Sequence, residues 1–310
     1  MYNLWLASTE DPQSARPLTN FEDRHIGFMV NWTYDSRHIL IKQDKVGDET
    51  FCVMSVPIDG SKPIPLSPEK GVQAHLQEAS RKHPDEVLIA HNERSEKYFD
   101  LYKVSLETGH SQLIEQNDQF SNLYTDSDFK VRLVRSYTDD GEAEYLHRPE
   151  GKEWQRYALI PIEDSLTTRP LTFSEDGQIL FWIDSRGRDK AVVVAEDTET
   201  RSRTVLAEDP RADISDLLFH PRTRHPLAAR ATYARDTLHA IDHNSSQFSQ
   251  LSKSSFPEMS YSAMPRMTPK SLSFSMSRDA NPLNTRALTD QPEPPRTCFL
   301  LIPNKAICLS

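Results

Sequence analysis

A short apolar run recurs along the first 230 residues of the chain at almost constant spacing. The central leucines of these runs, at positions 40, 88, 133, 180 and 227, are 48, 45, 47 and 47 residues apart. Each of the first four runs follows a turn-rich segment such as Asp35-Ser36 or Asp126-Ser127-Asp128. Three or four short antiparallel strands in a repeat of about 45 residues are the signature of a β-propeller blade.

Further strands are predicted after each run. A second strand follows about a dozen residues later, over 51–56, 100–104, 144–148 and 191–195, and then come a turn and a third strand such as Ser111 to Glu115. An α/β chain would need amphipathic helices, but no window of 12 or more residues between the strands has helical spacing. A β-sandwich would also give short strands, although not with this shared period.

The sequence therefore predicts an all-β fold, a partial β-propeller with about four full blades plus incomplete ones. A half repeat covers Leu4 to Thr19, and a broken fifth repeat follows Asp213.

The composition changes near residue 243. All nine glycines lie between Gly27 and Gly187, whereas residues 243–310 hold 13 serines, 8 prolines and 4 of the 7 methionines. Such a composition buries too little apolar surface to offset the entropy of ordering the chain. We expect two parts, an incomplete β-propeller domain over 1–242 and an irregular Ser/Pro-rich tail over 243–310.

Several strings within residues 3–242 resemble a known family. They are Asn3-Leu4-Trp5-Leu6 with Arg16-Pro17-Leu18-Thr19, the segment 32–40, the segment 184–189 and the segment 206–213. In order and spacing they are similar to the N-terminal propeller of the prolyl oligopeptidase family of serine peptidases, in its acylaminoacyl- and dipeptidyl-peptidase-like branch. The resemblance implies a propeller that covers an α/β-hydrolase domain and admits only short peptides to it.

The Ser-Asp-His triad that the resemblance implies belongs to that hydrolase domain, which would follow the propeller. No G-x-S-x-G nucleophile motif occurs, because the nearest string, Gly109-His110-Ser111-Gln112-Leu113, lacks the second glycine. We therefore assign no catalytic residue, metal or cofactor and expect a non-catalytic propeller fragment of such a peptidase. Two alternatives stay open: a stand-alone propeller that acts as a protein-interaction scaffold, and an active serine peptidase of which this sequence is a defective version.

The tail is consistent with a shifted reading frame. Read one nucleotide earlier, the codons of Lys253 to Ser262 and of Thr289 to Leu300 permit strings similar to those of the family's closing strands. Our hypothesis is that residues 243–310 are the product of a frameshift or a mis-joined exon. A genuine disordered tail is the alternative.

One charged turn is a candidate contact site. Asp184, Arg186, Arg188 and Asp189 alternate in sign around Gly187 between two predicted strands. They could line the propeller channel or contact the hydrolase domain. The plainer interpretation is a turn held by local Asp–Arg pairs, each contributing less than about 1 kcal/mol.

Other chemistry-bearing residues favour structural roles. His220 and His225 lack the further ligands that zinc needs and are expected in a solvated turn. The acidic segment 139–144 fits a hairpin turn better than a glycosidase pair, and Cys52 fits a buried strand position. Cys298 and Cys308 are accidental if the frame is shifted. The glycosylation sequons at Asn31 and Asn244 are expected to be silent without a signal peptide.

The formal net charge of -10 argues against nucleic acid as a partner. No run approaches the roughly 18 apolar residues of a membrane span. Three cysteines and the absence of a recognisable secretory signal favour a cytoplasmic location. The partners that the resemblance implies are the hydrolase domain of the intact family member and peptides.

Overall fold

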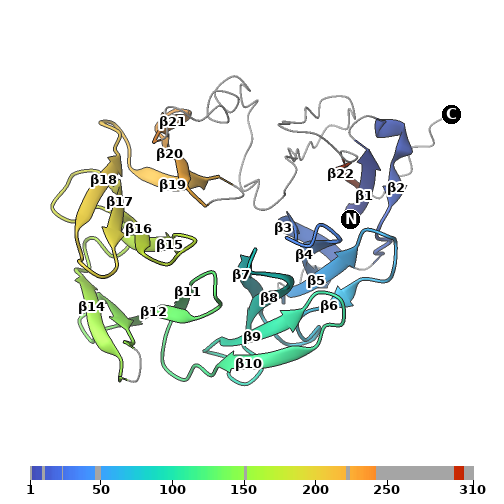
Figure 1. Cartoon of the computed structure of the whole chain (residues 1–310), viewed down its shortest axis with the longest axis horizontal. Coiled ribbons are helices and arrows are strands. Elements are labelled where there is room, and N and C mark those ends of the chain that lie inside the picture. Colours follow the sequence, from blue (N-terminus) through green and yellow to red (C-terminus); the bar gives the residue numbers. More distant parts are fainter. Residues whose placement is uncertain are drawn as a thin grey trace. The chain divides into compact units, whose positions relative to one another are not determined.

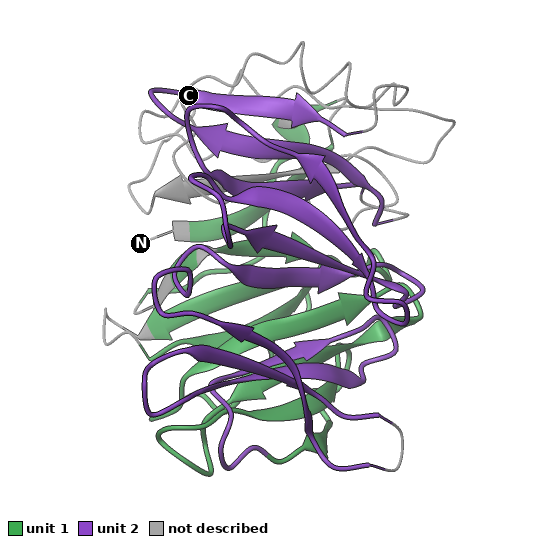
Figure 2. Ribbon diagram, turned by 90° about the vertical axis from the view of Figure 1, so that its left-hand side faces the viewer, with its two compact units in different colours: residues 1–116, 256–310 green, residues 117–255 purple. Residues whose placement is uncertain are grey.

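The computed structural model describes residues 2–8, 11–22, 24–45, 50–149, 152–220, 224–241 and 297–303. Within these ranges all regular structure is β-strand apart from one 3-10 turn, η1 (Pro12–Ser14). No helix in the described part is long and apolar enough to cross a membrane. The strands are labelled in Figure 1. The chain divides into two compact units, unit 1 with residues 1–116 and 256–310 and unit 2 with residues 117–255 (Figure 2).

Unit 1 contains three antiparallel sheets. Their strand orders are β2-β1-β22, β3-β4-β5-β6 and β10-β9-β8-β7. The bounds are β1 (Tyr2–Ser8), β2 (Arg16–Pro17), β3 (Arg24–Trp32), β4 (His38–Lys45), β5 (Cys52–Pro57), β6 (Ile64–Pro65), β7 (Ala74–Ser80), β8 (His83–His91), β9 (Asp100–Ser105), β10 (Ser111–Glu115) and β22 (Thr297–Pro303). β22 pairs with β1 along the whole length of both strands.

Unit 2 also contains three antiparallel sheets. Their orders are β11-β12-β13-β14, β15-β16-β17-β18 and β19-β20-β21. The bounds are β11 (Asn122–Thr125), β12 (Val131–Tyr137), β13 (Ala143–His147), β14 (Gln155–Ile160), β15 (Arg169–Phe173), β16 (Ile179–Asp184), β17 (Val192–Asp197), β18 (Arg203–Ala207), β19 (Ile214–Phe219), β20 (Pro226–Thr232) and β21 (Asp236–Ala240).

The four complete sheets correspond to the four predicted full repeats. Each is a four-stranded antiparallel meander, the unit from which propeller blades are built. The predicted half repeat forms β1 and β2, and three strands of the fifth repeat are described. The predicted all-β propeller fold class is therefore confirmed.

The position of the apolar run within each repeat was predicted wrongly. The five periodic leucines lie in β4, β8, β12, β16 and β20, which are second strands rather than first strands. The first strands lack a comparable run, since β7, for example, reads Ala-His-Leu-Gln-Glu-Ala-Ser. Strands buried on both faces are continuously apolar, so the second strands give a clear sequence signal, as do buried third strands such as β5 and β17.

The second strands β4 and β16 each pack on two neighbouring sheets. In β4, Ile39 and Ile41 join Leu4 and Leu6 of β1 in one core cluster. Leu40 between them joins a second cluster with β8 and β9. In unit 2, one core cluster likewise lies between the first and second sheets, and another lies between the second and third sheets. Because side chains alternate across a strand, one sheet contributes to two cores and is stable only between its neighbours.

Aspartates hold the turns that precede these second strands. Oδ1 of Asp126 accepts hydrogen bonds from the backbone N–H groups of Asp128 (3.0 Å) and Lys130 (3.1 Å). Oδ1 of Asp176 accepts from the N–H of Gln178 at 3.0 Å, and Gly177 beside it has φ +72°. A short carboxylate that binds the backbone two residues on is a local turn signal. The predicted turn segments at 35–36, 126–128 and 175–177 are thus turns in the structure, whereas the fourth, predicted at 83–85, lies inside β8.

The predicted boundary at residue 242 lies outside the described residues. So does the predicted tail, except for β22, in which a Cys-Phe-Leu-Leu-Ile run forms a strand.

Candidate functional site

Asp184 and Arg186, two of the four predicted contact residues, form a buried ion pair. Asp184 is the last residue of β16, and 7% of its side chain is exposed. Its Oδ2 accepts from Arg186 Nη2 at 2.6 Å, and its Oδ1 accepts from Arg186 Nε and from the Arg186 backbone N–H, both at 3.0 Å. Their positions agree with the plainer interpretation, a turn held by a local Asp–Arg pair.

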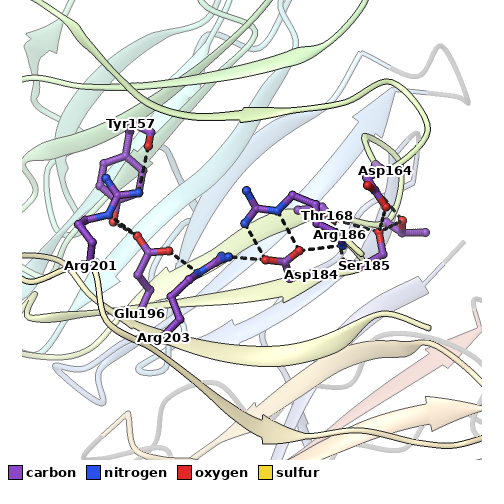
Figure 3. A network of polar contacts seen from close by, with 10 residues as sticks. Tyr157, Asp164, Thr168, Asp184, Ser185, Arg186, Glu196, Arg201 and Arg203 are labelled. Atoms are coloured by element: carbon purple, nitrogen blue, oxygen red, sulfur yellow. Dashed lines mark hydrogen bonds and ion pairs between the residues drawn. The ribbon is translucent and has the colours of Figure 1, made fainter. Parts of the chain in front are cut away.

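A second carboxylate extends this pair into a network (Figure 3). Glu196 of β17 has 2% of its side chain exposed and receives Arg201 Nε at 2.7 Å and Arg203 Nε at 2.8 Å. Arg203 Nη2 reaches Asp184 Oδ2 at 2.8 Å, so this arginine joins the two carboxylates. Arg201, Glu196, Arg203, Asp184 and Arg186 thus form a row of alternating charge.

Strand alternation explains why these charges meet. Asp184 lies two residues after Trp182 in β16, and Glu196 lies two residues after Val194 in β17. Residues two apart in a strand face the same side of the sheet. Trp182 and Val194 both belong to the core cluster shared with the sheet β11–β14. The alternation therefore places both carboxylates on the face of their sheet that packs on the neighbouring sheet.

Aromatic rings cover the network on that side. The ring of Trp182 is fully buried and stacks with the ring of Tyr157 of β14, with centroids 6.4 Å apart. The Tyr157 hydroxyl donates to Glu196 Oε1 at 2.6 Å, and Arg201 Cζ lies 3.4 Å from the centroid of the Tyr157 ring. Arg201 Nη2 also donates to the Tyr157 carbonyl at 3.0 Å. The network thus joins two sheets of unit 2.

The negative charges of Asp184 and Glu196 are compensated by the arginines that contact them. Burial by itself would raise the pKa of Asp184, but the hydrogen bonds from Arg186 and the charge of Arg203 outweigh it and hold that pKa below its usual value. Burial, together with the hydrogen bond to Glu196, raises the pKa of Tyr157. Three guanidinium groups face two carboxylates, so the network is net positive by one charge.

A hydroxyl cluster adjoins the network at the start of the β16–β17 turn. Ser185 Oγ donates to Asp164 Oδ1 at 2.6 Å and lies 2.7 Å from Thr167 Oγ1 and 3.0 Å from Thr168 Oγ1. The Ser185 backbone N–H donates to Thr168 Oγ1 at 2.9 Å. These contacts tie the β14–β15 connection to the β16–β17 turn.

The contacts of the network and of the hydroxyl cluster hold segments of unit 2 in position. An activated serine needs a general base in contact with its hydroxyl, and the partners of Ser185 include no histidine. The carboxylates of Asp184 and Glu196 are both bound by arginines. Among the described residues, no group of three His, Cys, Asp or Glu side chains is arranged to hold a metal ion.

The other two predicted contact residues lie apart from the network. Arg188 and Asp189 are exposed in the β16–β17 turn, where Asp189 Oδ2 accepts from Lys190 Nζ at 2.7 Å and 91% of the Asp189 side chain is accessible. The four residues are close together in the chain, and the structure divides them into a buried pair and an exposed pair.

Sequence reasoning also missed Glu196, Arg201, Arg203 and Tyr157. A signal for Glu196 exists, because in β17 it occupies the alternate position that Val192 and Val194 fill with apolar side chains. A charge on the buried side of an alternating strand calls for a partner, and Arg203 lies opposite it in the next strand.

The remaining candidates lie where structural roles were expected. The His220 backbone N–H donates to the His225 carbonyl at 2.7 Å across the β19–β20 turn. Asp139 to Glu142 form the β12–β13 turn with Gly141 at φ +82°. Cys52 is 3% exposed in β5, and Asn31 lies in β3 paired with Leu40. The side chain of Cys298, and all of Cys308 and Asn244, lie outside the described residues.

Two curated proteins match the chain in sequence. Dipeptidyl aminopeptidase BIII of Pseudoxanthomonas mexicana is 34% identical over 241 residues, which are 77% of this chain and 35% of that protein. Dipeptidyl peptidase family member 6 of Caenorhabditis elegans is 27% identical over 235 residues, which are 70% of this chain and 32% of that protein. The chain thus spans about a third of the length of these relatives.

The chain is also similar to solved structures. Prolyl oligopeptidase B of Galerina marginata has a TM-score of 0.47 at 10% identity, over 74% of this chain and 36% of that chain. Oligopeptidase B of Trypanosoma brucei has a TM-score of 0.45 at 14% identity, over 74% and 35%. No protein-family model matches the chain. The two sequence relatives confirm the family resemblance noted above.

Proposed function

The chain is a homologue of dipeptidyl peptidases over about a third of their length, and from this premise we propose that it is the propeller region of a prolyl-oligopeptidase-like serine peptidase. The observation that carries the proposal is the 34% identity over 241 residues. In this role the region is non-catalytic. It covers a hydrolase domain and admits short unfolded peptides while excluding folded proteins.

The site supports this role by its chemistry. The buried charges of the second sheet of unit 2 join neighbouring sheets, as a domain that must keep its shape requires. Of the predicted contact residues, only Arg188 and Asp189 are exposed enough to meet a peptide in the channel or a hydrolase domain. That contact stays a prediction.

The absence of catalysis is tested with the full chain. The purified protein is incubated with a mixture of peptides of increasing length and, separately, with a fluorophosphonate probe that labels activated serines. We expect no cleavage and no labelling. Cleavage that the probe abolishes would contradict the proposal and would favour an active serine peptidase.

The gating role is tested in a chimaera. Residues 3–242 replace the matched third of dipeptidyl aminopeptidase BIII, and the product is offered a short peptide and a folded protein that contains the same cleavable N-terminus. We expect the short peptide alone to be cleaved. Equal cleavage of the folded protein would show that this propeller does not restrict access.

A further inference from the structure

Two loops of unit 2 expose large apolar side chains at one end of its first sheet. The β12–β13 turn follows Tyr137, which is 51% exposed, and the β14–β15 connection carries Ile162 at 59% and Leu166 at 90%. In the other described parts of unit 2, only Val205 and Tyr233 are exposed large hydrophobic residues. Three of the five such residues therefore lie in these two loops.

The strand register brings the two loops together. Tyr137 of β12 is opposite Ala143 of β13, and Ala143 is opposite Ile160 of β14, so the turn and the connection leave the sheet at the same level. A Cβ on Gly141 would lie 3.1 Å from Ile162 Cδ1, so the two loops are in contact. We define the acidic apolar patch as residues 137–142 and 161–166.

Every charged residue of the acidic apolar patch is a carboxylate. Its two segments contain no Lys, Arg or His. They contain five acidic residues, Asp139, Asp140, Glu142, Glu163 and Asp164. Asp164 Oδ1 accepts from Ser185 Oγ at 2.6 Å (Figure 3). The other four carboxylates form no hydrogen bond or ion pair with the described part of the chain.

Three arginines adjoin the patch without pairing with its carboxylates. Arg135 Cζ lies 5.2 Å from the centroid of the Tyr137 ring. Arg186, which is bound by Asp184, and the exposed Arg188 lie in the neighbouring β16–β17 turn. Within the described residues none of these arginines forms an ion pair with the patch. Five carboxylates against three arginines leave this surface net negative.

Local hydrogen bonds hold the backbone of both loops. In the turn, the Gly141 N–H donates to the Thr138 carbonyl and the Thr138 N–H to the Glu142 carbonyl, both at 3.0 Å. In the connection, the Asp164 carbonyl accepts from the Thr168 N–H at 2.8 Å. A loop that is ordered before binding loses less conformational entropy when a partner binds.

The chemistry and size of the patch indicate what binds to it. Exposed apolar side chains with a polar rim are typical of interaction sites. Here the rim is negative, and electrostatic complementarity favours a positively charged partner. The patch consists of two segments of six residues each, whereas a stable protein interface uses about 20–30 residues a side. A short peptide segment therefore matches it better than a folded domain.

We propose that the acidic apolar patch of unit 2 binds a short cationic peptide segment in which Lys or Arg alternates with apolar residues. The apolar side chains of the peptide pack on Tyr137, Ile162 and Leu166, and its positive groups face the carboxylates of both loops. The proposal does not rest on the proposed peptidase relationship.

Fluorescence anisotropy with the full chain tests the proposal. The probe is a labelled peptide of alternating lysine and leucine with a blocked N-terminus, which keeps binding separate from any removal of N-terminal residues. Its matched controls are a glutamate–leucine and a lysine–serine peptide. We expect saturable binding of the lysine–leucine peptide that weakens with salt, and binding of each control that is weaker by about tenfold or more.

Substitutions in the chain locate the binding site. One variant carries Asp139→Asn, Asp140→Asn and Glu163→Gln, and a second carries Leu166→Ser. We expect each to weaken binding of the lysine–leucine peptide by about tenfold.

The matched control carries Glu153→Gln, Glu175→Gln and Glu199→Gln. It removes the same number of charges at the opposite end of the sheets, since antiparallel strands reverse at each turn. We expect this variant to bind like the wild type, and likewise Val205→Ser, which changes an exposed apolar residue outside the patch.

Three results would overturn the proposal. They are a wild type that does not bind the lysine–leucine peptide, equal binding of the glutamate–leucine peptide, and binding that both patch variants leave unchanged. Self-association of the chain that the patch variants abolish would overturn it as well, in favour of a second copy as the occupant.

Discussion

At the scale of single residues, the buried charges of the second sheet of unit 2 are the most sensitive positions. Glu196 has 2% of its side chain exposed and receives two arginines and a tyrosine hydroxyl. Glu196→Gln leaves Arg201 and Arg203 without that carboxylate, and breaking a buried ion pair is strongly destabilising. Because the arginines are partly exposed, we expect a loss of about 2 kcal/mol in the free energy of unfolding, measured in urea.

Asp189→Asn is the control for this substitution, since it removes an ion pair at a fully accessible carboxylate. Exposed pairs often contribute nothing measurable. Equal effects of the two substitutions would contradict the assignment of Glu196 to a buried network.

The ionisation of Asp35 makes the stability of unit 1 depend on pH. Although burial opposes it, hydrogen bonds from His38, from Thr33 and from the Arg37 backbone N–H lower the pKa of Asp35 to about 2. A carboxyl with a lowered pKa stabilises the fold above its unfolded pKa, and this contribution is lost as the pH falls toward 2. Between pH 5 and pH 2, we expect the wild type to lose about 2 kcal/mol more than Asp35→Asn.

The measurement is chemical unfolding at several pH values. Asp85→Asn serves as the matched control, because it removes an exposed carboxylate that contacts Arg37 from the neighbouring sheet. If wild type and Asp35→Asn lost the same stability over this range, the hydrogen bonds to Asp35 would not have the effect assigned to them.

Of the side-chain contacts, only those between residues close together in the chain could be predicted from the sequence. Asp184 and Arg186 pair within two residues of each other, so a turn motif could predict their contact. Glu196 meets Tyr157 across 39 residues, and that contact depends on the packing of one sheet on the next. A single sequence contains no local signal for which sheets are neighbours.

At the scale of elements, the turns between strands fix how one sheet meets the next. Gly109, in the β9–β10 turn, has φ +70°, and a Cβ at this position would lie 2.8 Å from the Pro65 carbonyl oxygen of β6. Gly71 has a similar φ of +65° with no atom within 4 Å of such a Cβ. Both sites lie in unit 1.

We therefore expect Gly109→Ala and Gly71→Ala to differ in cost. The left-handed backbone alone costs an alanine about 1 kcal/mol, which is the expected loss for Gly71→Ala. Gly109→Ala adds a clash with backbone, and we expect up to about 3 kcal/mol in total. Thermal unfolding of the two variants side by side checks this, and equal shifts would show that β6 and the β9–β10 turn are not in close contact.

The elements themselves could be predicted in part. The third strand β9 was predicted over 100–104 and runs from Asp100 to Ser105. Of the second strand β8, only the apolar run 87–89 was predicted, because its first residues are polar and were expected to form a turn. First strands such as β7 and β15 carry a mixture of polar and apolar side chains. Their presence was implied only by the four-strand pattern of a blade, and for this reason the apolar run was placed one strand too early.

At the scale of the whole molecule, the repeat period predicted the fold class, and the strings within it predicted the family. What the molecule does with this fold depends on chemistry that neither the period nor the buried network supplies. The relatives are about three times the length of the matched region, and we propose that catalysis belongs to a hydrolase domain outside this region.

The measurement that tests this account most directly is the nucleotide sequence from about codon 235 to well beyond the stop codon, read in all three forward frames. We propose that residues 243–310 arise from a shifted frame, and we expect another frame to continue into a strand-turn-helix with G-x-S-x-G and then Asp and His. An intact frame followed by nothing that resembles a hydrolase would contradict the assignment to a peptidase and would leave a propeller whose role is to bind other proteins.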